Sequence, residues 1–369
     1  MPRANPLLIQ VVPQLKPGRC GVTDHVVALA EELNGSFGIQ TAFVVLNSEE
    51  RCCLAYPIIH CAPEQLLESC LAHSKGEPAA VLVHVSGYGY SADGAPTKLA
   101  DALAGVKKDG RFSIAAFFHE LFATGAPWTA AFWHSHKQQK AVRKIAELCD
   151  LIVTNTGYYA QWLQTRTKRQ SAGQIQLLPV LSTVGESRDR IPAAGREPAL
   201  AVFGLPATRR KAYRELSALP KVLSALGIQE IRDFGLGVDV PAEVNGIPIT
   251  RKGPLDASEL SEELSHARYG FLSFPAFVLG KSSIFAAYCA QGTIPVVAKG
   301  FDGEVDGLRD GEQLLSPKTV KAALASDLDR CSMRAWQWYT AHGVHAHAAA
   351  YARWLNQPAL IDDRAEARI

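Results

Sequence analysis

The N-terminal half of the chain alternates short apolar runs with longer amphipathic stretches. An apolar run over 7–12 ends at Pro13, and apolar positions then recur at helical spacing between Val26 and Leu33. Thr23 or Asp24 is positioned to cap this helix. Nearly continuous apolar runs are typical of strands buried on both faces of a parallel sheet. We therefore predict strands over 7–12, 41–46, 80–85, 113–118 and 151–154, separated by helices.

A second series of the same kind begins near Ala199. Its apolar runs predict strands over 200–203, 230–234, 269–274 and 294–298, with helices over 212–226, 258–267 (capped by Ser258) and 282–290. The segment 182–198 is rich in Gly, Ser, Arg and Pro and is the predicted linker. A last helical stretch, broken or kinked at Gly343, covers about 333–355.

These patterns predict two Rossmann-like, doubly wound parallel-sheet α/β domains that face a cleft. The predicted boundaries are 1–185 for the N-terminal domain, 199–332 for the C-terminal domain, 333–357 for a helix that packs back on the N-terminal domain, and 358–369 for a tail.

Length and composition agree with this organisation. The chain has 369 residues, which is too long for one ordinary domain, and 47% of them are hydrophobic. A net charge of +2, with no block of like charges, argues against a nucleic-acid partner. No apolar run is long enough to span a bilayer, which leaves open a peripheral membrane contact. Oligomeric state cannot be read from the sequence.

The cysteines and histidines predict no metal site. There are eight cysteines but no CxxC pair, and the run over 7–13 is interpreted as a strand rather than a secretory leader, so a reduced, cytoplasmic chain is expected. The cluster Cys52, His60, Cys61 and Cys70 fits no regular zinc spacing. His342, His345 and His347 lie close together, but Gly343 interrupts them and no carboxylate adjoins them.

Ligands of open parallel sheets bind beyond the carboxyl ends of the strands, so the residues that follow each strand are the candidates. The first cluster is the turn 17–24, whose Gly18 and Gly21 lead into a helix with amides suited to an anion. The second is 84–90, where two glycines give a mobile backbone and Tyr88 and Tyr90 offer flat rings for a sugar. An ordinary strand–helix turn and locally packed tyrosines fit the same residues.

The third cluster is 117–120, where His119 and Glu120 follow an apolar strand. This position suits acid/base work or the orientation of a hydroxyl, although a lone histidine is often structural. An aromatic stretch that includes Trp128 comes soon after.

The fourth cluster is 274–283. Gly280 permits close approach, Lys281 supplies a charge, and Ser282 and Ser283 supply hydroxyls and amides at a helix start, which together form a diphosphate cradle. A capped helix with a solvated lysine is the simpler alternative. In the same half, 209–211 (Arg-Arg-Lys) follows a strand and can neutralise phosphates.

In this order the clusters resemble the GT-B glycosyltransferases, particularly retaining enzymes of the family 4 type, over nearly the whole chain. The similar phrases are 19–24 (first glycine loop), His119-Glu120 (strand-end histidine motif), 290–297 (helix-to-strand turn) and 307–315 (the following segment).

The resemblance implies a nucleotide-diphosphate-sugar donor on the C-terminal half and an acceptor hydroxyl, on a carbohydrate, a lipid-linked molecule or another compound, on the N-terminal half. It implies no metal and no cofactor, because helix amides and basic side chains neutralise the leaving diphosphate. The resemblance places Gly21 and His119 at the donor and makes Arg210 and Lys281 candidates for its phosphates; Gly280, Ser282 and Ser283 of the fourth cluster are expected there too. Asp24, Tyr88, Tyr90 and Trp128 are expected on the acceptor side.

One departure from the family concerns its paired glutamates, whose positions hold Leu279 and Ala287 here. Glu304 is the nearest following carboxylate for the nucleotide. Either this chain grips its donor differently, with Lys281 and Ser282 compensating, or it is a catalytically inactive binding or scaffold subunit. A nucleotide-sugar epimerase or phosphorylase of the same fold is a further alternative. The central expectation is a pyrophosphate at 280–282 that faces the turn 18–21.

Overall fold

The chain forms two compact units, and its path crosses from one to the other twice. The computed structural model describes residues 6–356 apart from 19, 49, 51, 126–127, 168–174, 238 and 326. Unit 1 comprises Met1–Leu178 and Val344–Ile369, and unit 2 comprises Pro179–Gly343. The predicted linker, 182–198, therefore belongs to unit 2, and the predicted tail, 358–369, lies outside the described residues.

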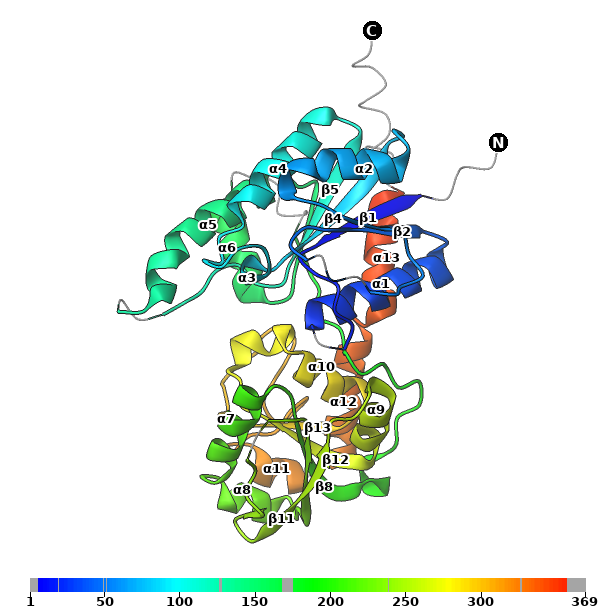
Figure 1. The fold of residues 1–369 in the computed structure, drawn as a ribbon. Helices are drawn as coiled ribbons and strands as arrows, with labels where there is room; N and C mark the ends of the chain where they lie inside the picture. The colour runs from blue at the N-terminus through cyan, green and yellow to red at the C-terminus, as the bar shows by residue number, and fades with distance from the viewer. Residues whose placement is uncertain are drawn as a thin grey trace. The chain divides into compact units, whose positions relative to one another are not determined.

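Unit 1 is built on a fully parallel seven-stranded sheet (Figure 1). The strand order is β3-β2-β1-β4-β5-β6-β7, so the winding direction reverses between β1 and β4. Every residue of β5 is buried, as expected for a strand covered on both faces. The strands are β1 (Leu7–Val12), β2 (Gln40–Val45), β3 (Ile58–His60), β4 (Ala79–Val85), β5 (Phe112–Phe118), β6 (Leu151–Thr154) and β7 (Ile175–Leu177).

Helices cover both faces of this sheet. They are α1 (Gly21–Phe37), η1 (Pro63–Gln65), α2 (Leu66–Ser74), α3 (Gly87–Tyr90), α4 (Thr97–Asp109), α5 (Ala130–Leu148), α6 (Gly157–Arg166) and α13 (Val344–Leu355). The predicted cap of α1 is wrong: the helix begins at Gly21, so Thr23 and Asp24 lie inside its first turn, and Cys20 occupies the N-cap without a side-chain hydrogen bond.

Unit 2 has a six-stranded sheet in the order β10-β11-β9-β8-β12-β13, parallel except for the β10–β11 pair. Its winding direction reverses between β8 and β12. The strands are β8 (Glu197–Phe203), β9 (Glu230–Phe234), β10 (Glu243–Val244), β11 (Ile247–Gly253), β12 (Ala267–Leu272) and β13 (Ile294–Val297). The prediction of two doubly wound α/β domains is therefore confirmed.

Three predicted helices of the second half differ from the observed ones. The helix predicted over 212–226 is two helices, because Pro220 begins a new one. Asp256, not Ser258, caps α9 and forms a capping box with Glu259. The stretch 333–355 is broken around Gly343 as predicted, between Thr340 and Val344, but only its second part packs on unit 1: α12 lies in unit 2, and α13 packs on α1.

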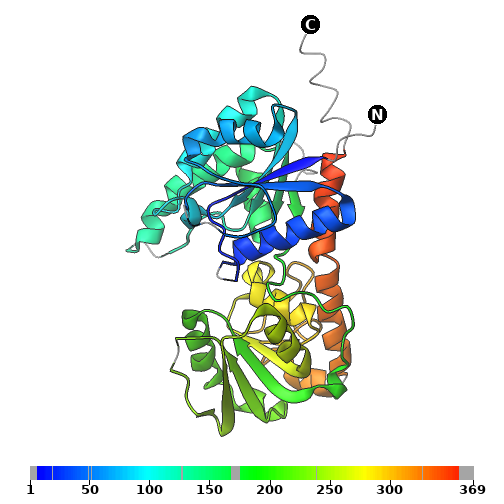
Figure 2. The same cartoon turned by 45° about the vertical axis from the view of Figure 1, so that its right-hand side comes forward.

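The helices of unit 2 are η3 (Ala193–Gly195), α7 (Pro206–Leu216), α8 (Pro220–Ala225), α9 (Ala257–His266), η4 (Ala276–Lys281), α10 (Ser283–Ala290), α11 (Val320–Ala325) and α12 (Leu328–Thr340). Figure 2 shows α9, α10 and α12 from a second direction. No described helix in either unit is long and apolar enough to cross a membrane.

Candidate functional site

The loop after β1 is held by two side chains of α1. Asp24 Oδ1 accepts the Gly18 amide at 2.7 Å, and Gly18 has a φ of 70°, which favours glycine. Thr23 Oγ1 accepts the amide of Lys16 at 3.0 Å. Burial raises the pKa of Asp24, while the Gly18 amide opposes that rise. Asp24 thus shapes the loop, and Gly21 opens α1 with open space around it.

The glycines after β4 serve close packing rather than mobility. A Cβ at Gly87 would lie 2.2 Å from the carbonyl oxygen of Gly94, and one at Gly89 would lie 2.7 Å from Pro13 Cγ. This turn is the short helix α3, not the mobile backbone that the sequence suggested. Gly89 thus lets the segments that follow β1 and β4 meet at the reversal point of the sheet, and Gly87 lets the turn fold against Gly94.

The two tyrosines of this turn have different surroundings. The Tyr90 hydroxyl lies 3.2 Å from the Val11 carbonyl oxygen and 3.1 Å from that of His84, so it is engaged by the ends of β1 and β4. Tyr88 is 52% exposed and accepts a hydrogen bond from Gln138 at 3.4 Å. Tyr88 is therefore the ring that remains open to a ligand.

A hollow of about 390 Å³ lies at this edge of unit 1. Asn47, which follows β2, reaches into the turn and donates to the carbonyl oxygens of Gly89 and Tyr90. The lining mixes polar and apolar side chains: Asn47, Pro63, Tyr90, Ser91, Ala95, Pro96, Thr97, Lys98, Leu99 and Lys137. Trp128 is not part of it; it precedes α5 and is 85% exposed.

Four buried histidine rings meet in the interior of unit 1. His25 lies on α1, His84 on β4, His119 directly after β5, and His347 on α13. The His25 ring centroid is 5.7 Å from that of His84 and 5.2 Å from those of His119 and His347. The sequence pattern points to His119 alone for chemistry, because its three partners come from positions far apart along the chain.

The tautomers of His84 and His119 follow from a chain of hydrogen bonds. The Val26 carbonyl can only accept, so the Gln10 amide nitrogen faces it at 3.3 Å and Gln10 Oε1 faces His84 Nε2 at 2.9 Å. Neutral His84 therefore donates from Nε2, and its Nδ1 accepts from His119 Nε2 at 3.1 Å. His119 Nδ1 is left with a lone pair.

Burial lowers the pKa of His25, His84 and His119 well below the usual range, and the neighbouring histidines lower it further. The rings are consequently neutral near neutral pH. His119, which is 8% exposed, is suited to accept a hydrogen bond from a substrate hydroxyl rather than to act as a charged acid. Its neighbour Glu120 is half-buried, and its amide donates to the Val85 carbonyl at 3.4 Å.

In unit 2, three segments meet where β8 and β12 end. Gly204 follows β8 with a φ of 124°, and a Cβ there would lie 2.7 Å from Ile284 on α10. Lys211 Nζ donates to the Ser273 carbonyl oxygen, just after β12, at 2.8 Å. Ser273 is 4% exposed, and its hydroxyl has no hydrogen-bond partner among the described residues. A buried unpaired hydroxyl at a sheet's reversal point makes Ser273 a candidate ligand contact.

The start of α10 adjoins this point. Ser282 is the N-cap: its Oγ accepts the Phe285 amide at 3.2 Å, so the hydroxyl is already engaged. The Gly280 carbonyl accepts the Val180 amide at 2.8 Å. Ser283 is half-buried, and its amide is among the first of the helix, which have no partner within the helix itself. Lys281 ends η4 and is half-buried.

The adjacent Arg209 and Arg210 of α7 differ in burial. Arg209 is 1% exposed and pairs with Asp233, which also accepts from Tyr213 at 2.7 Å. Arg209 is therefore structural, whereas Arg210 is exposed. Glu304 lies on the surface after β13 and forms an ion pair with Arg309 at 2.8 Å.

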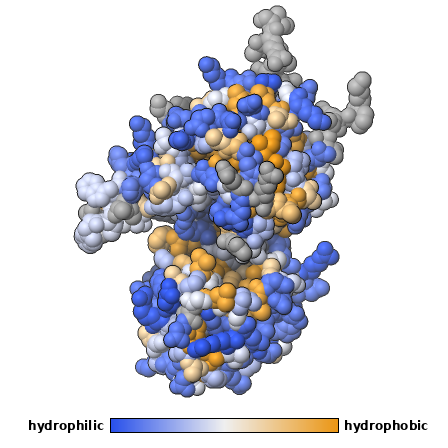
Figure 3. Space-filling view, viewed as in Figure 1, coloured by the Kyte–Doolittle hydropathy of each residue, from blue (hydrophilic) through white to orange (hydrophobic). Residues whose placement is uncertain are grey.

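Both positions of the missing glutamates are packed in the core of unit 2. Leu279 is 1% exposed and Ala287 is fully buried. Large apolar side chains that follow strand ends are instead exposed nearby: Leu205 after β8, Leu236 after β9 and Phe277 after β12. Figure 3 shows apolar colouring over the region of η4. The ligand edge of unit 2 is thus more apolar than the family pattern implies.

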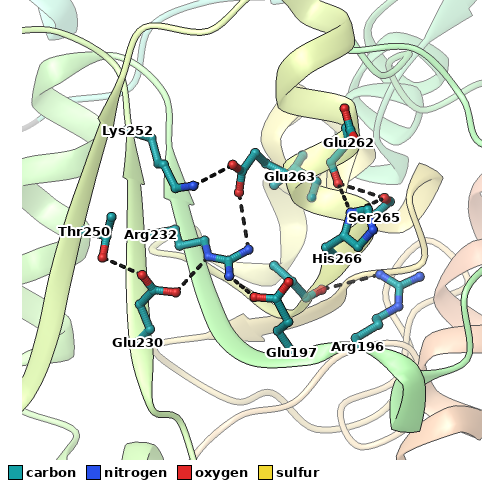
Figure 4. Close-up of polar contacts among 12 residues, drawn as sticks. Arg196, Glu197, Glu230, Arg232, Thr250, Lys252, Glu262, Glu263, Ser265 and His266 are labelled. Carbon is teal, nitrogen blue, oxygen red and sulfur yellow. Dashed lines mark hydrogen bonds and ion pairs between the residues drawn. The ribbon is translucent and has the colours of Figure 1, made fainter.

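A second hollow in unit 2, of about 480 Å³, is lined by an ion network (Figure 4). Arg232 pairs with Glu197, with Glu230 at 2.9 Å and with Glu263 at 3.3 Å, and Lys252 pairs with Glu263 at 2.7 Å. Glu197 and Glu230 are the first residues of their strands, so this network joins β8, β9, β11 and α9 away from the carboxyl edge. Each of the two cations is held by at least one of the three carboxylates, so both are engaged within the protein, and we assign the network a structural role.

In the described part of the chain, no three His, Cys, Asp or Glu side chains are placed to hold a metal ion.

Known proteins resemble this chain in structure but not in sequence. No protein-family profile matches it, and no curated protein sequence does. An alpha-glucosyltransferase in complex with UDP-glucose and DNA has a TM-score of 0.59 at 12% identity, over 95% of this chain and 99% of that one. Trehalose-6-phosphate synthase from E. coli, bound with UDP-2-fluoro glucose, has a TM-score of 0.59 at 10% identity, over 95% and 99%.

A Listeria monocytogenes protein assigned as a UDP-N-acetylglucosamine 2-epimerase has a TM-score of 0.55 at 11% identity, over 94% of each chain. These similarities, together with the two doubly wound sheets, define the class: the chain has the two-domain GT-B fold. Membership of family 4 and the retaining outcome stay predictions, as do the absence of a cofactor and of a nucleic-acid partner.

Proposed function

We propose that this protein transfers a sugar from a nucleoside-diphosphate donor to an acceptor hydroxyl. The observation that carries the proposal is the buried, unpartnered hydroxyl of Ser273, which lies at the reversal point of the unit 2 sheet, beside Lys211. Structural neighbours bound to UDP-sugars share this fold, which supports the choice of ligand class.

The donor diphosphate would occupy the start of α10. The positive end of the helix dipole and the amides of Ser283 and Ile284 favour an anion, and Lys281 and Arg210 add charge. Stabilising the departing diphosphate would be the largest catalytic contribution, and these groups supply it without a metal ion. Exposed Phe277 offers a face for the nucleobase.

Unit 1 would supply the acceptor side. His119 Nδ1 accepts from a sugar hydroxyl and so orients it, while Tyr88 and the hollow beside α3 bind the acceptor. A carbohydrate is the best match, since the hollow offers both polar and apolar side chains and Tyr88, on the same short helix as Tyr90, exposes an aromatic ring.

Titration with UDP, GDP and ADP tests the donor site. A diphosphate present at a hundred times its Kd should stabilise the protein by about 2.7 kcal/mol. Ser273→Ala should weaken binding about fivefold, as expected for one neutral hydrogen bond, without lowering the stability of the free protein. Thr41→Val is the matched control, because Thr41 Oγ1 is also buried without a partner but lies in unit 1. Equal affinities for Ser273→Ala and the unaltered protein would refute this placement.

A second candidate function is nucleotide-sugar binding without turnover. The apolar burial of Leu279 and Ala287 favours it, because no carboxylate stands where the resembled family carries two. Product formation from a nucleotide sugar separates the two. A transferase forms product and loses it in His119→Ala, whereas a binder keeps its nucleotide affinity and forms no product in either version.

A further inference from the structure

The beginning of α5 exposes an unusual group of large aromatic side chains. Trp128 is 85% exposed, Trp133 72% and Phe132 45%. Phe132 and Trp133 touch edge to face, with ring centroids 5.5 Å apart. Figures 1 and 2 show this end of α5 projecting from the rest of unit 1. We call these three residues the aromatic tip; exposed apolar groups of this kind mark an interaction surface.

A row of basic side chains continues from the aromatic tip along the same face of α5. Trp133, Lys137, Lys140 and Lys144 are spaced by four, three and four residues, which places them on one helical stripe, and all are exposed. Arg143 is exposed beside them. We call Lys137, Lys140, Arg143 and Lys144 the basic stripe.

Only part of this charge is neutralised within the protein. Lys137 pairs with Asp93 at 2.5 Å, and Lys144 pairs with Asp101. In the described residues no ion pair engages Lys140 or Arg143. The stripe therefore keeps a positive charge next to the aromatic rings.

Aromatic rings at one end and cations along the side fit an anionic lipid surface. Tryptophan prefers the headgroup region of a bilayer, where its ring is apolar and its N–H is solvated. A cation near an anionic surface contributes attraction that salt screens. The whole chain carries only +2, so the charge on this face is local rather than a general affinity for polyanions.

We infer that unit 1 docks on an anionic membrane surface through α5. The aromatic tip enters the headgroup region, and the basic stripe lies against the anionic headgroups. This contact is peripheral, and it does not depend on the proposed sugar transfer.

Co-sedimentation of the full chain with vesicles tests the inference. Vesicles in which about a third of the lipid is phosphatidylglycerol should bind the protein, and vesicles of phosphatidylcholine alone should bind it at least roughly tenfold more weakly. Binding should fall as salt rises, and tryptophan emission should shift to shorter wavelength as the rings leave water. Failure to bind the anionic vesicles at low salt overturns the inference.

Two double variants separate the contributions of the tip and the stripe. Trp128→Ser with Trp133→Ser should abolish the emission shift, and Lys140→Glu with Arg143→Glu should reduce binding roughly tenfold or more. These side chains are exposed, so neither change should alter folding, which circular dichroism checks.

The matched control is Arg214→Glu with Lys221→Glu, which makes the same change in net charge on exposed residues of unit 2. It should leave vesicle binding unchanged, and an equal loss in this control would show that only overall charge matters, against the inference. A DNA duplex that binds through the same α5 residues while vesicles do not would assign the face to nucleic acid and overturn the membrane as partner.

Discussion

The buried histidine cluster should make unit 1 lose stability as the pH falls below neutrality. Burial, reinforced by the neighbouring rings, lowers the pKa of His25, His84 and His119 well below the unfolded value. Above the unfolded pKa of about 6.5, both states are neutral and the full stability is present. Below that pKa, the histidines of the unfolded chain bind protons while the buried rings of the folded protein stay neutral, so the free energy of unfolding decreases.

The size of the effect follows from the number of rings. For a ring that stays neutral in the folded state, the linkage relation gives a loss of about 1.4 kcal/mol between pH 7.5 and pH 5.5. The three rings together give about 4 kcal/mol, a large part of the 5–15 kcal/mol that is typical of a domain.

His25→Leu isolates one ring of the cluster. Neither ring nitrogen of His25 has a hydrogen-bond partner among the described residues, so an apolar side chain of similar volume should leave the stability near pH 7.5 unchanged or raised. The loss of stability down to pH 5.5 should shrink by about 1.4 kcal/mol. The raised pKa of Asp24 is common to both proteins and cancels in this comparison.

Urea unfolding followed by tryptophan fluorescence measures this difference. In a Trp336→Phe, Trp338→Phe background the remaining tryptophans all lie in unit 1, so the signal reports that unit. His136→Gln, an exposed histidine of the same unit, is the control and should leave the pH dependence as it is. An unchanged pH dependence in His25→Leu would refute the reasoning that the ring is neutral because it is buried.

Two further predictions concern the packing around glycines and a buried ion pair. A Cβ at Gly270 would lie 2.4–2.6 Å from three ring atoms of the buried Tyr288, so Gly270→Ala should lower the free energy of unfolding, measured in urea, by about 1–3 kcal/mol. Gly105→Ala is the matched control in unit 1: Gly105 lies on α4 with open space around it, so this change should raise the free energy of unfolding by about 0.4–1 kcal/mol. Arg209→Met leaves the Asp233 carboxylate buried without its partner and should cost about 3–5 kcal/mol. Adding Asp233→Leu should recover much of that loss, and a double variant no more stable than Arg209→Met would contradict this account.

Local sequence patterns were sufficient to predict the central strands of both sheets, but not the outer strands β3, β7, β10 and β11 or the ends of several helices. The apolar runs identified the central strands because a strand buried on both faces must be apolar throughout. The N-caps were predicted wrongly because several polar residues near the start of each helix could act as the N-cap. Asp256 and Ser258 lie two residues apart at the start of α9, and only the backbone geometry selects Asp256 as the N-cap.

The sequence by itself determined two α/β units and marked the strand ends where ligands are expected, since periodicity and apolar runs are local properties of the chain. Tertiary structure alone decided which of the marked residues already bind another part of the protein: Ser282 caps its helix, Tyr90 joins two strand ends, and Arg209 forms an ion pair with Asp233. It also placed His347 beside His25 and left the Ser273 hydroxyl unpaired. Such contacts depend on residues far apart along the chain, and no local pattern records them.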